Sequence, residues 1–405
     1  MITSYAHIPG ATRTTDHSKP AIMLVRISTN FGGAERHVFE LYQRLAAAGY
    51  PVTLVVDHCL PLIALLNHAQ LPYYLVSVKP ITKVSPLIGS YILSRILRKI
   101  CQEAPPAILH TNGIPEAMAA TRVAKKLGCK TVLTIHSDYK KPSKFKKTVA
   151  AIDALITVNH DLYKIYTGIC TTIPHVQTII PLFDAPTFNP TIHATTDRSN
   201  YFTQTFNLSV GNVPIITKLA NFYSDPLIKN HSLLIKAVNI LVHDRHLPLH
   251  VLLVGGCSSK SAKVHQQAAH HLVHDLKLEH VVSFIGFTHD TMQLFQHSDI
   301  VLLASTRETV GLVLAEAALL ERPTIAPSRT GAAYVVEHEK TGLVFENGNE
   351  QDLADKIEQL IKNPVWAQQL GRNGRQRVLE KFGSEQSFAQ HEALYKNLSH
   401  TSSVE

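Results

Sequence analysis

Short apolar runs alternate with helical stretches along most of this chain, and this alternation restricts the fold more than any other feature. Residues 21–27 form an apolar run that leads into Gly32 and Gly33. Residues 35–48 then show helical spacing, and residues 52–56 form a second apolar run. A helix between two strands returns the chain to the same end of the sheet, so the strands pair in parallel. The pattern therefore predicts a parallel sheet covered by helices.

The alternation stops near the middle of the chain and then starts again. Residues 180–211 are rich in Pro, Thr, Asp, Ser and Asn, a composition typical of a linker. Further strands are expected at residues 215–219, 249–254, 281–285, 300–304 and 324–326. We therefore predict an α/β protein of two Rossmann-like, doubly wound domains facing a central cleft, at residues 20–185 and 210–382. A C-terminal helix at residues 383–400 is expected to pack back on the first domain.

Composition and charge restrict the number of domains, the kind of partner and the cellular compartment. It has 405 residues, more than one hydrophobic core usually organises, and 45% of them are apolar. The formal net charge of +8 favours anionic partners, such as phosphates or acidic lipid surfaces. The five cysteines are scattered, residues 1–19 lack the apolar core of a signal peptide, and no apolar stretch is long enough to span a membrane. We expect a cytoplasmic protein.

The most informative segment, residues 305–316, follows the expected strand at residues 300–304. Glu308 lies in the turn, and Glu316 comes eight residues later, about 12 Å along an α-helix. Two carboxylates at this spacing can bind hydroxyl groups at opposite ends of one ligand, while the N-terminus of the helix binds a diphosphate between them. On spacing alone, a helix with an acidic start and a second, solvated glutamate is an equally good interpretation.

In its context this segment resembles the E-x-F-G-x-x-x-x-E signature of the retaining glycosyltransferases of family four, which have the GT-B fold. Glu308, Gly311 and Glu316 are in register, and Val310 stands where the family usually has Phe. Three more segments resemble the family in order, at residues 282–288, 298–305 and 342–345.

The resemblance assigns donor-binding roles in the second domain. It implies that Glu308 contacts the sugar and Glu316 the ribose of a nucleoside-diphosphate sugar, with uridine or guanosine as the base. The diphosphate would lie against the turn and helix start, and the base against the strand end. The residues concerned are Val310, Gly311, Leu312, Gly286 and Phe287.

Two lysines stand where the family commonly places the Arg and Lys that bind the donor diphosphate. Lys218 belongs to the region of the expected strand at residues 215–219, and Lys229 opens a helix. Fixed cations are needed there because the departing diphosphate gains negative charge in the transition state. Taken alone, such lysines are more often solvated. The sequence contains no Asp-x-Asp pair, so we expect neither a metal nor a cofactor.

The first domain carries further candidates around the reaction centre. The Gly32-Gly33 turn matches the family's first glycine loop, which implies that it binds the donor close to its phosphate and to the acceptor, although by itself it could be a plain strand-to-helix turn. His136 follows an expected strand and resembles the family histidine that approaches the donor sugar. Asn30 and Asn112, the latter close to His110, are weaker acceptor-side candidates. A lone histidine is more often structural than catalytic.

Two other groups of side chains have structural and functional interpretations. His270 and His274 have an i, i+4 spacing that can bind zinc, but a solvated helix face is several times more common. Residues 87–100 predict a basic amphipathic helix, which suits contact with an anionic membrane as well as it suits a core-packed helix. Five lysines lie close after His136, namely Lys140, Lys141, Lys144, Lys146 and Lys147.

Together these features predict a metal-independent enzyme of the hexosyltransferase type. It would move a sugar from the donor to a hydroxyl of a glycan or lipid-linked acceptor, in the synthesis of cell-surface lipopolysaccharide, capsule or exopolysaccharide. Peripheral contact with the inner face of the plasma membrane is a further hypothesis. A sugar-nucleotide epimerase of the same fold and a non-catalytic nucleotide-sugar-binding subunit are the alternatives. Nucleic acid is not expected as a partner, because the basic residues lack interleaved stacking aromatics.

Overall fold

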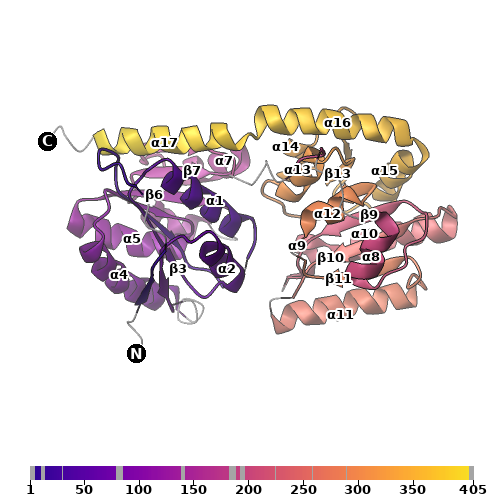
Figure 1. The fold of residues 1–405 in the computed structure, drawn as a ribbon, viewed down its shortest axis with the longest axis horizontal. Helices are drawn as coiled ribbons and strands as arrows, with labels where there is room; N and C mark the ends of the chain where they lie inside the picture. Colours follow the sequence, from indigo (N-terminus) through magenta and orange to yellow (C-terminus); the bar gives the residue numbers. More distant parts are fainter. Residues whose placement is uncertain are drawn as a thin grey trace. The chain divides into compact units, whose positions relative to one another are not determined.

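The chain forms two compact units in the computed structural model (Figure 1). Unit 1 comprises Met1–Phe183 and Ser384–Glu405, and unit 2 comprises Asp184–Gly383. The chain thus leaves unit 1 once, completes unit 2, and returns. The structure describes residues 5–10, 14–29, 31–78, 85–137, 142–181, 188–191, 197–223, 225–257, 259–288 and 290–400.

Unit 1 is built on an eight-stranded sheet in the order β1-β4-β3-β2-β5-β6-β7-β8. All neighbours pair in parallel except β1, which pairs antiparallel with β4. The strands are β1 (Tyr5–Ile8), β2 (Ile22–Arg26), β3 (Val52–Val56), β4 (Tyr73–Val76), β5 (Ile108–Thr111), β6 (Lys130–Ile135), β7 (Ala154–Thr157) and β8 (His175–Thr178). The helices are α1 (Gly33–Ala47), α2 (Leu60–His68), α4 (Pro86–Glu103), α5 (Ile114–Leu127), η1 (Pro142–Phe145), α6 (Lys146–Val149), α7 (His160–Ile169) and α17 (Ser384–His400).

Strand β2 shows how the apolar runs produce a sheet that is buried on both faces. Successive side chains of a strand point to opposite faces. Ile22 and Leu24 join a core formed with α1, α2 and α17, whereas Met23 and Val25 join a core formed with α4 and α5. An uninterrupted apolar run is therefore what this position requires.

Unit 2 has a six-stranded parallel sheet in the order β11-β10-β9-β12-β13-β14. The strands are β9 (Ile215–Leu219), β10 (His250–Val254), β11 (Val282–Gly286), β12 (Ile300–Leu302), β13 (Thr324–Pro327) and β14 (Leu343–Phe345). The helices are α8 (Arg198–Phe206), α9 (Pro226–Lys229), α10 (His231–Asn239), η2 (Ile240–Asp244), α11 (Lys260–Asp275), α12 (Thr291–Gln296), α13 (Leu312–Leu319), α14 (Ala332–Val335), α15 (Glu350–Lys362) and α16 (Pro364–Lys381). One core joins the sheet to α10, α11, α15 and α16.

The predicted strands and the parallel, doubly wound topology are confirmed, but β1, β4, β8 and α8 were not expected. Two of these elements show why. β1 lies in the polar N-terminal stretch and is held at the sheet edge by pairing with β4. α8 lies within residues 180–211, whose composition indicated a linker. It forms because Asp197 caps it by accepting from the Asn200 amide, and because Tyr201 and Phe202 are buried beside His297.

Candidate functional site

The strand order of unit 2 makes the ends of β9 and β12 the candidate position for a ligand. β10 and β11 lie on one side of β9, and β12, β13 and β14 lie on the other. In such a sheet the crossovers leave adjacent strands in opposite directions, which opens a crevice at their carboxyl ends. Lys218 lies in β9, and Glu308 follows β12.

Lys229 and Glu308 form an ion pair at this position. The Nζ of Lys229 donates to Oε2 of Glu308 over 2.5 Å, and the two side chains are only 18% and 16% exposed. Burial by itself lowers the pKa of Lys229, but the charge and the hydrogen bond of Glu308 outweigh it and raise the pKa. Thr306 Oγ1 also donates to the Leu227 carbonyl over 2.7 Å. The short helix α9 is thus fixed to the turn that carries Glu308.

Lys218 lies beside this pair and is fully buried. Its Nζ has no hydrogen-bond partner within the described part of the chain. Burial lowers the pKa of Lys218 well below its usual range, and the nearby Lys229 lowers it further. Glu308 bonds to Lys229 and acts on Lys218 only through its charge, so among the described residues two amino groups lie near one carboxylate, and Lys218 lacks an acceptor. An anionic ligand would supply what is missing.

Gly311 fixes the turn between Glu308 and α13. Its φ of +76° lies in the left-handed region, and a Cβ there would come within 2.9 Å of the Ala332 Cα. Helix α13 begins at Leu312, directly after Gly311, so Val310 belongs to the turn. Val310 is buried, and so is Glu316 on α13. The alternative interpretation of Glu316 as a solvated glutamate is therefore wrong.

The end of β11 brings two more of the predicted residues to the carboxyl edge of the sheet in unit 2. The Gly286 carbonyl accepts from the Gly255 amide over 2.7 Å, and Gly286 has a left-handed φ of +75°. Phe287 follows and is half exposed. An exposed aromatic ring next to a strand end offers a stacking surface for a flat ligand group.

In unit 1 the glycine turn follows β2 and leads into α1. Gly32 has an extended backbone and caps the helix, which begins at Gly33. Asn30 lies outside the described residues. Arg26, which interrupts the apolar run of β2, donates to Glu35 Oε1 from both Nε and Nη2 and to the Asn112 carbonyl from Nη1. This contact joins the glycine turn to the end of β5, and only the interruption by Arg26 could have signalled it from the sequence.

His136 and Asn112 lie together at the ends of β6 and β5. His136 Nε2 is 2.9 Å from Asn112 Oδ1. Burial lowers the pKa of His136 well below its usual range, and the positive charge of Arg26 lowers it further. The imidazole is therefore neutral near pH 7, which suits a hydrogen bond to a substrate hydroxyl better than an ionic contact.

The side chain of His110 is held inside unit 1. It is fully buried, and its ring nitrogens lie 2.6 Å from Tyr395 Oη and 2.7 Å from Thr134 Oγ1. Both nitrogens are thus occupied. The His110 side chain is thus bonded within unit 1, whereas the side chain of the neighbouring candidate Asn112 contacts His136.

The other groups singled out in the sequence have partners or exposure of their own. His270 stacks on Phe284, and His274 pairs with Glu279. Among the residues that the structure describes, no three His, Cys, Asp or Glu side chains are arranged to hold a metal. Lys146 and Lys147 are exposed, while Lys140 and Lys141 lie outside the described residues. None of the described helices is long and apolar enough to cross a membrane.

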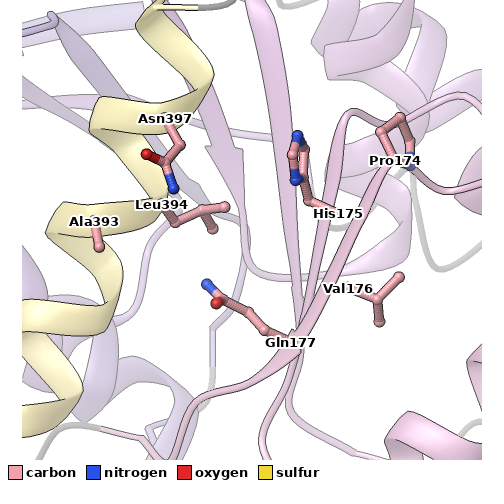
Figure 2. A pocket seen from close by; sticks show the side chains of 7 residues that line it. All are labelled: Pro174, His175, Val176, Gln177, Ala393, Leu394 and Asn397. Atoms are coloured by element: carbon pink, nitrogen blue, oxygen red, sulfur yellow. The ribbon is translucent and has the colours of Figure 1, made fainter.

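A pocket of about 280 Å³ lies between β8 and α17 in unit 1 (Figure 2). It is lined by Pro174, His175, Val176, Gln177, Ala393, Leu394 and Asn397. None of the predicted site residues lines it.

Comparison with known proteins identifies the relatives of each half of the chain. The family model for glycosyltransferase family 4 matches residues 31–176, and that for glycosyl transferases group 1 matches residues 207–377. N-acetyl-alpha-D-glucosaminyl L-malate synthase of Bacillus anthracis is 36% identical over 124 residues, or 31% of this chain and 32% of that protein. Poly(ribitol-phosphate) alpha-N-acetylglucosaminyltransferase of Staphylococcus aureus is 31% identical over 159 residues, or 39% of this chain and 31% of that protein. The chain thus spans about a third of the length of these relatives.

Solved structures match nearly the whole chain. A glycosyltransferase from Rickettsia africae has a TM-score of 0.81 at 21% identity, covering 94% of this chain and 99% of that one. Anabaena HepE, in complex with UDP-glucose, has a TM-score of 0.79 at 19% identity, covering 93% of this chain and 100% of that one. At these identities the likeness shows the fold, and the predicted GT-B fold is confirmed.

Proposed function

Because the chain belongs to the family 4 glycosyltransferases, we propose that it transfers a sugar from a nucleoside-diphosphate donor to a hydroxyl acceptor with retention of configuration. The bond from the sugar C1 to the diphosphate oxygen breaks, and a bond from C1 to the acceptor oxygen forms on the same face. The acceptor proton passes to the departing diphosphate, so no protein nucleophile is needed.

The proposal depends on the group formed by Lys218, Lys229 and Glu308. The Lys218 amino group is buried and has no hydrogen-bond partner among the described residues, and it lies beside Lys229, which is paired with Glu308. This arrangement suits an anion. In our proposal both lysines stabilise the charge that develops on the diphosphate. They perform the task that a divalent cation has in other transferases, which makes the reaction metal-independent.

The remaining predicted residues complete the donor and acceptor contacts. Glu308 would hold donor-sugar hydroxyls once the ligand binds Lys229, Glu316 the ribose, and Phe287 the base. His136 would offer a neutral imidazole to the transferred sugar, and Asn112 orients that imidazole. Gly32 and Gly33 would allow close approach at the start of α1.

The printed names of relatives narrow the substrates within this proposal. HepE was solved with UDP-glucose, and another relative is named for capsular polysaccharide biosynthesis, CapM of Staphylococcus aureus. We propose a uridine-diphosphate sugar as donor, with a guanosine-diphosphate sugar as the alternative, and a cell-surface glycan or its lipid-linked precursor as acceptor.

A panel of nucleotides and one substitution test this function. UDP, GDP and ADP are compared by thermal shift, because a ligand at a hundred times its dissociation constant stabilises the folded state by about 2.7 kcal/mol. The sugar forms of the selected nucleotide are then assayed with and without acceptors. Glu308→Gln is expected to lower transfer at least about a hundredfold while keeping nucleotide binding. A changed donor without any acceptor would indicate an epimerase, and full transfer by Glu308→Gln would refute the assigned role.

Peripheral membrane contact fits the surface of α4. Leu87, Ile88 and Tyr91 are 64%, 57% and 57% exposed on its first turns, and Arg95 and Lys99 are exposed further along it. Apolar side chains beside cations suit the interface of an anionic bilayer. Arg95→Gln combined with Lys99→Gln is expected to reduce sedimentation with phosphatidylglycerol vesicles but to leave sedimentation with phosphatidylcholine vesicles unchanged. Equal binding of the variant and the parent protein to both vesicles would remove the membrane from the proposal.

A further inference from the structure

Helix α17 brings residues from the far end of the chain into the core beneath the candidate site of unit 1. Leu394, Tyr395 and Leu398 belong to the same core as Ile22 and Leu24 of β2. His391 and Tyr395 are completely buried. α17, drawn in yellow in Figure 1, is therefore an integral part of unit 1.

A chain of hydrogen bonds connects α17 to the two strands that carry His136 and Asn112. Tyr395 Oη lies 2.6 Å from His110 Nδ1, and His110 Nε2 lies 2.7 Å from Thr134 Oγ1. His110 lies in β5 two residues before Asn112, and Thr134 lies in β6 two residues before His136. The hydroxyl of Tyr395 thus holds a ring that bridges β5 and β6 just below the predicted site.

Aromatic contacts form a second connection. The ring of His37 on α1 lies 5.1 Å from that of His136 and 5.4 Å from that of His391, between centroids. His391 is itself fixed, because its Nδ1 donates to the Ser387 carbonyl over 2.8 Å. Burial lowers the pKa of all three histidines, so the rings are held by packing and hydrogen bonds and not by charge.

We propose that Tyr395 and His391 are positioning residues, which set the orientation of His136 and Asn112 through His110, Thr134 and His37. The inference deepens the proposed transferase function and its use for catalysis rests on that function. Neither residue touches a substrate in this arrangement. Both act by fixing the strand ends that present the side chains to the sugar.

Tyr395→Phe is the test, with Tyr50→Phe as a matched control. Each change removes one hydroxyl of a buried tyrosine whose hydrogen bond joins α17 to the rest of unit 1. Tyr395 lies on α17, and Tyr50 Oη donates to Glu392 Oε1 of α17 over 2.9 Å. The two hydroxyls differ in their partners, because that of Tyr395 bonds to the His110 ring and that of Tyr50 bonds to a carboxylate. The readout is the histidine NMR spectrum of the full chain labelled in its imidazole rings, with signals assigned by single histidine substitutions.

Tyr395→Phe is expected to shift the ring signals of both His110 and His136, whereas Tyr50→Phe leaves the His136 signals in place. Unchanged His136 signals in Tyr395→Phe, or equal changes in both variants, would overturn the proposal. This result does not depend on any activity, so a failure of the transferase function is recognised separately. Urea unfolding of each variant checks that it is folded.

For the active enzyme, we expect Tyr395→Phe to lower kcat about tenfold with little change in the KM of the donor. In a His136→Ala background Tyr395→Phe should lower kcat little further, because the imidazole that Tyr395 orients is absent. His391→Ala should act like Tyr395→Phe, and His391→Phe, which retains an aromatic ring beside His37, should restore most of the rate. An equal loss from Tyr395→Phe in both backgrounds would show a general structural role and overturn the inference.

Discussion

Lys218 occupies a position in β9 where an apolar residue would be more stable. Its amino group is fully buried without a described hydrogen-bond partner, beside the second amino group of Lys229. Replacing a buried amino group that lacks an acceptor by a hydrophobic residue of similar length removes a burial cost of about 1–3 kcal/mol. In the proposed function, Lys218 serves the ligand at the expense of the stability of the free protein.

Lys218→Met is therefore expected to raise the free energy of unfolding of the ligand-free protein by about 1–3 kcal/mol. The same change should weaken UDP binding about tenfold or more, because it removes a charged hydrogen-bond donor. Urea unfolding and isothermal titration calorimetry measure the two effects. Lys236→Met, at an exposed lysine of α10, is the control and should change neither. A destabilised Lys218→Met variant would contradict this account.

The turn before α13 combines two demands that only glycine meets at position 311. Its left-handed φ is unfavourable for other residues, and a Cβ would press on the backbone of Ala332 at 2.9 Å. Gly311→Ala should thus lower the free energy of unfolding by about 2–4 kcal/mol and weaken nucleotide binding, because the turn carries Glu308. Gly348→Ala is the control. Gly348 has a φ of +89°, but the position that a Cβ would occupy is open. Gly348→Ala should therefore lower the free energy of unfolding only by the backbone cost of about 1 kcal/mol.

The sequence predicted elements well where the signal was local. The apolar run of β2 and the glycine after it defined a strand, a turn and a helix correctly. β1 was missed because four residues at a sheet edge acquire their conformation from β4, and α8 was missed because tertiary packing of Tyr201 outweighs a polar composition. The elements that the sequence failed to predict are therefore those whose conformation depends on contacts with distant parts of the chain.

The same division applies to the candidate sites. The ion pair of Lys229 with Glu308 connects segments that the family resemblance had already associated, and the strand order explains why they meet. Nothing local could have predicted that His110 binds Tyr395, because 285 residues separate them in the chain. The partnership exists only through the return of α17 to unit 1.

At the scale of the whole molecule, the buried histidines of unit 1 make the free energy of unfolding depend on pH. Burial lowers the pKa of His37, His110 and His136, and that of His391 to about 4. Well above about pH 6.5 these rings are neutral in both the folded and the unfolded chain. As the pH falls below 6.5, the unfolded chain binds protons that the folded chain does not, so stability decreases towards pH 4.

For His391 alone this loss amounts to about 3 kcal/mol at pH 4. Urea unfolding followed by circular dichroism between pH 7.5 and 4.5 should show the decline, and His391→Phe should reduce its slope. Histidines of unit 2 add to the total, since burial also lowers the pKa of His231. An identical pH dependence in the parent protein and His391→Phe would refute the contribution of His391.

The return of α17 to unit 1 also has a consequence for how the chain is made. A ribosome synthesises the first sheet early, yet Leu394, Tyr395 and Leu398, which close one face of that sheet, are added only after all of unit 2. Until these residues are added, the growing polypeptide carries an uncovered apolar surface on unit 1. Unit 2 is complete at residue 383 and can therefore fold before unit 1. Chaperones that hold nascent chains would be needed most in this interval, and premature termination shortly before residue 384 should yield aggregates even though every strand has been translated.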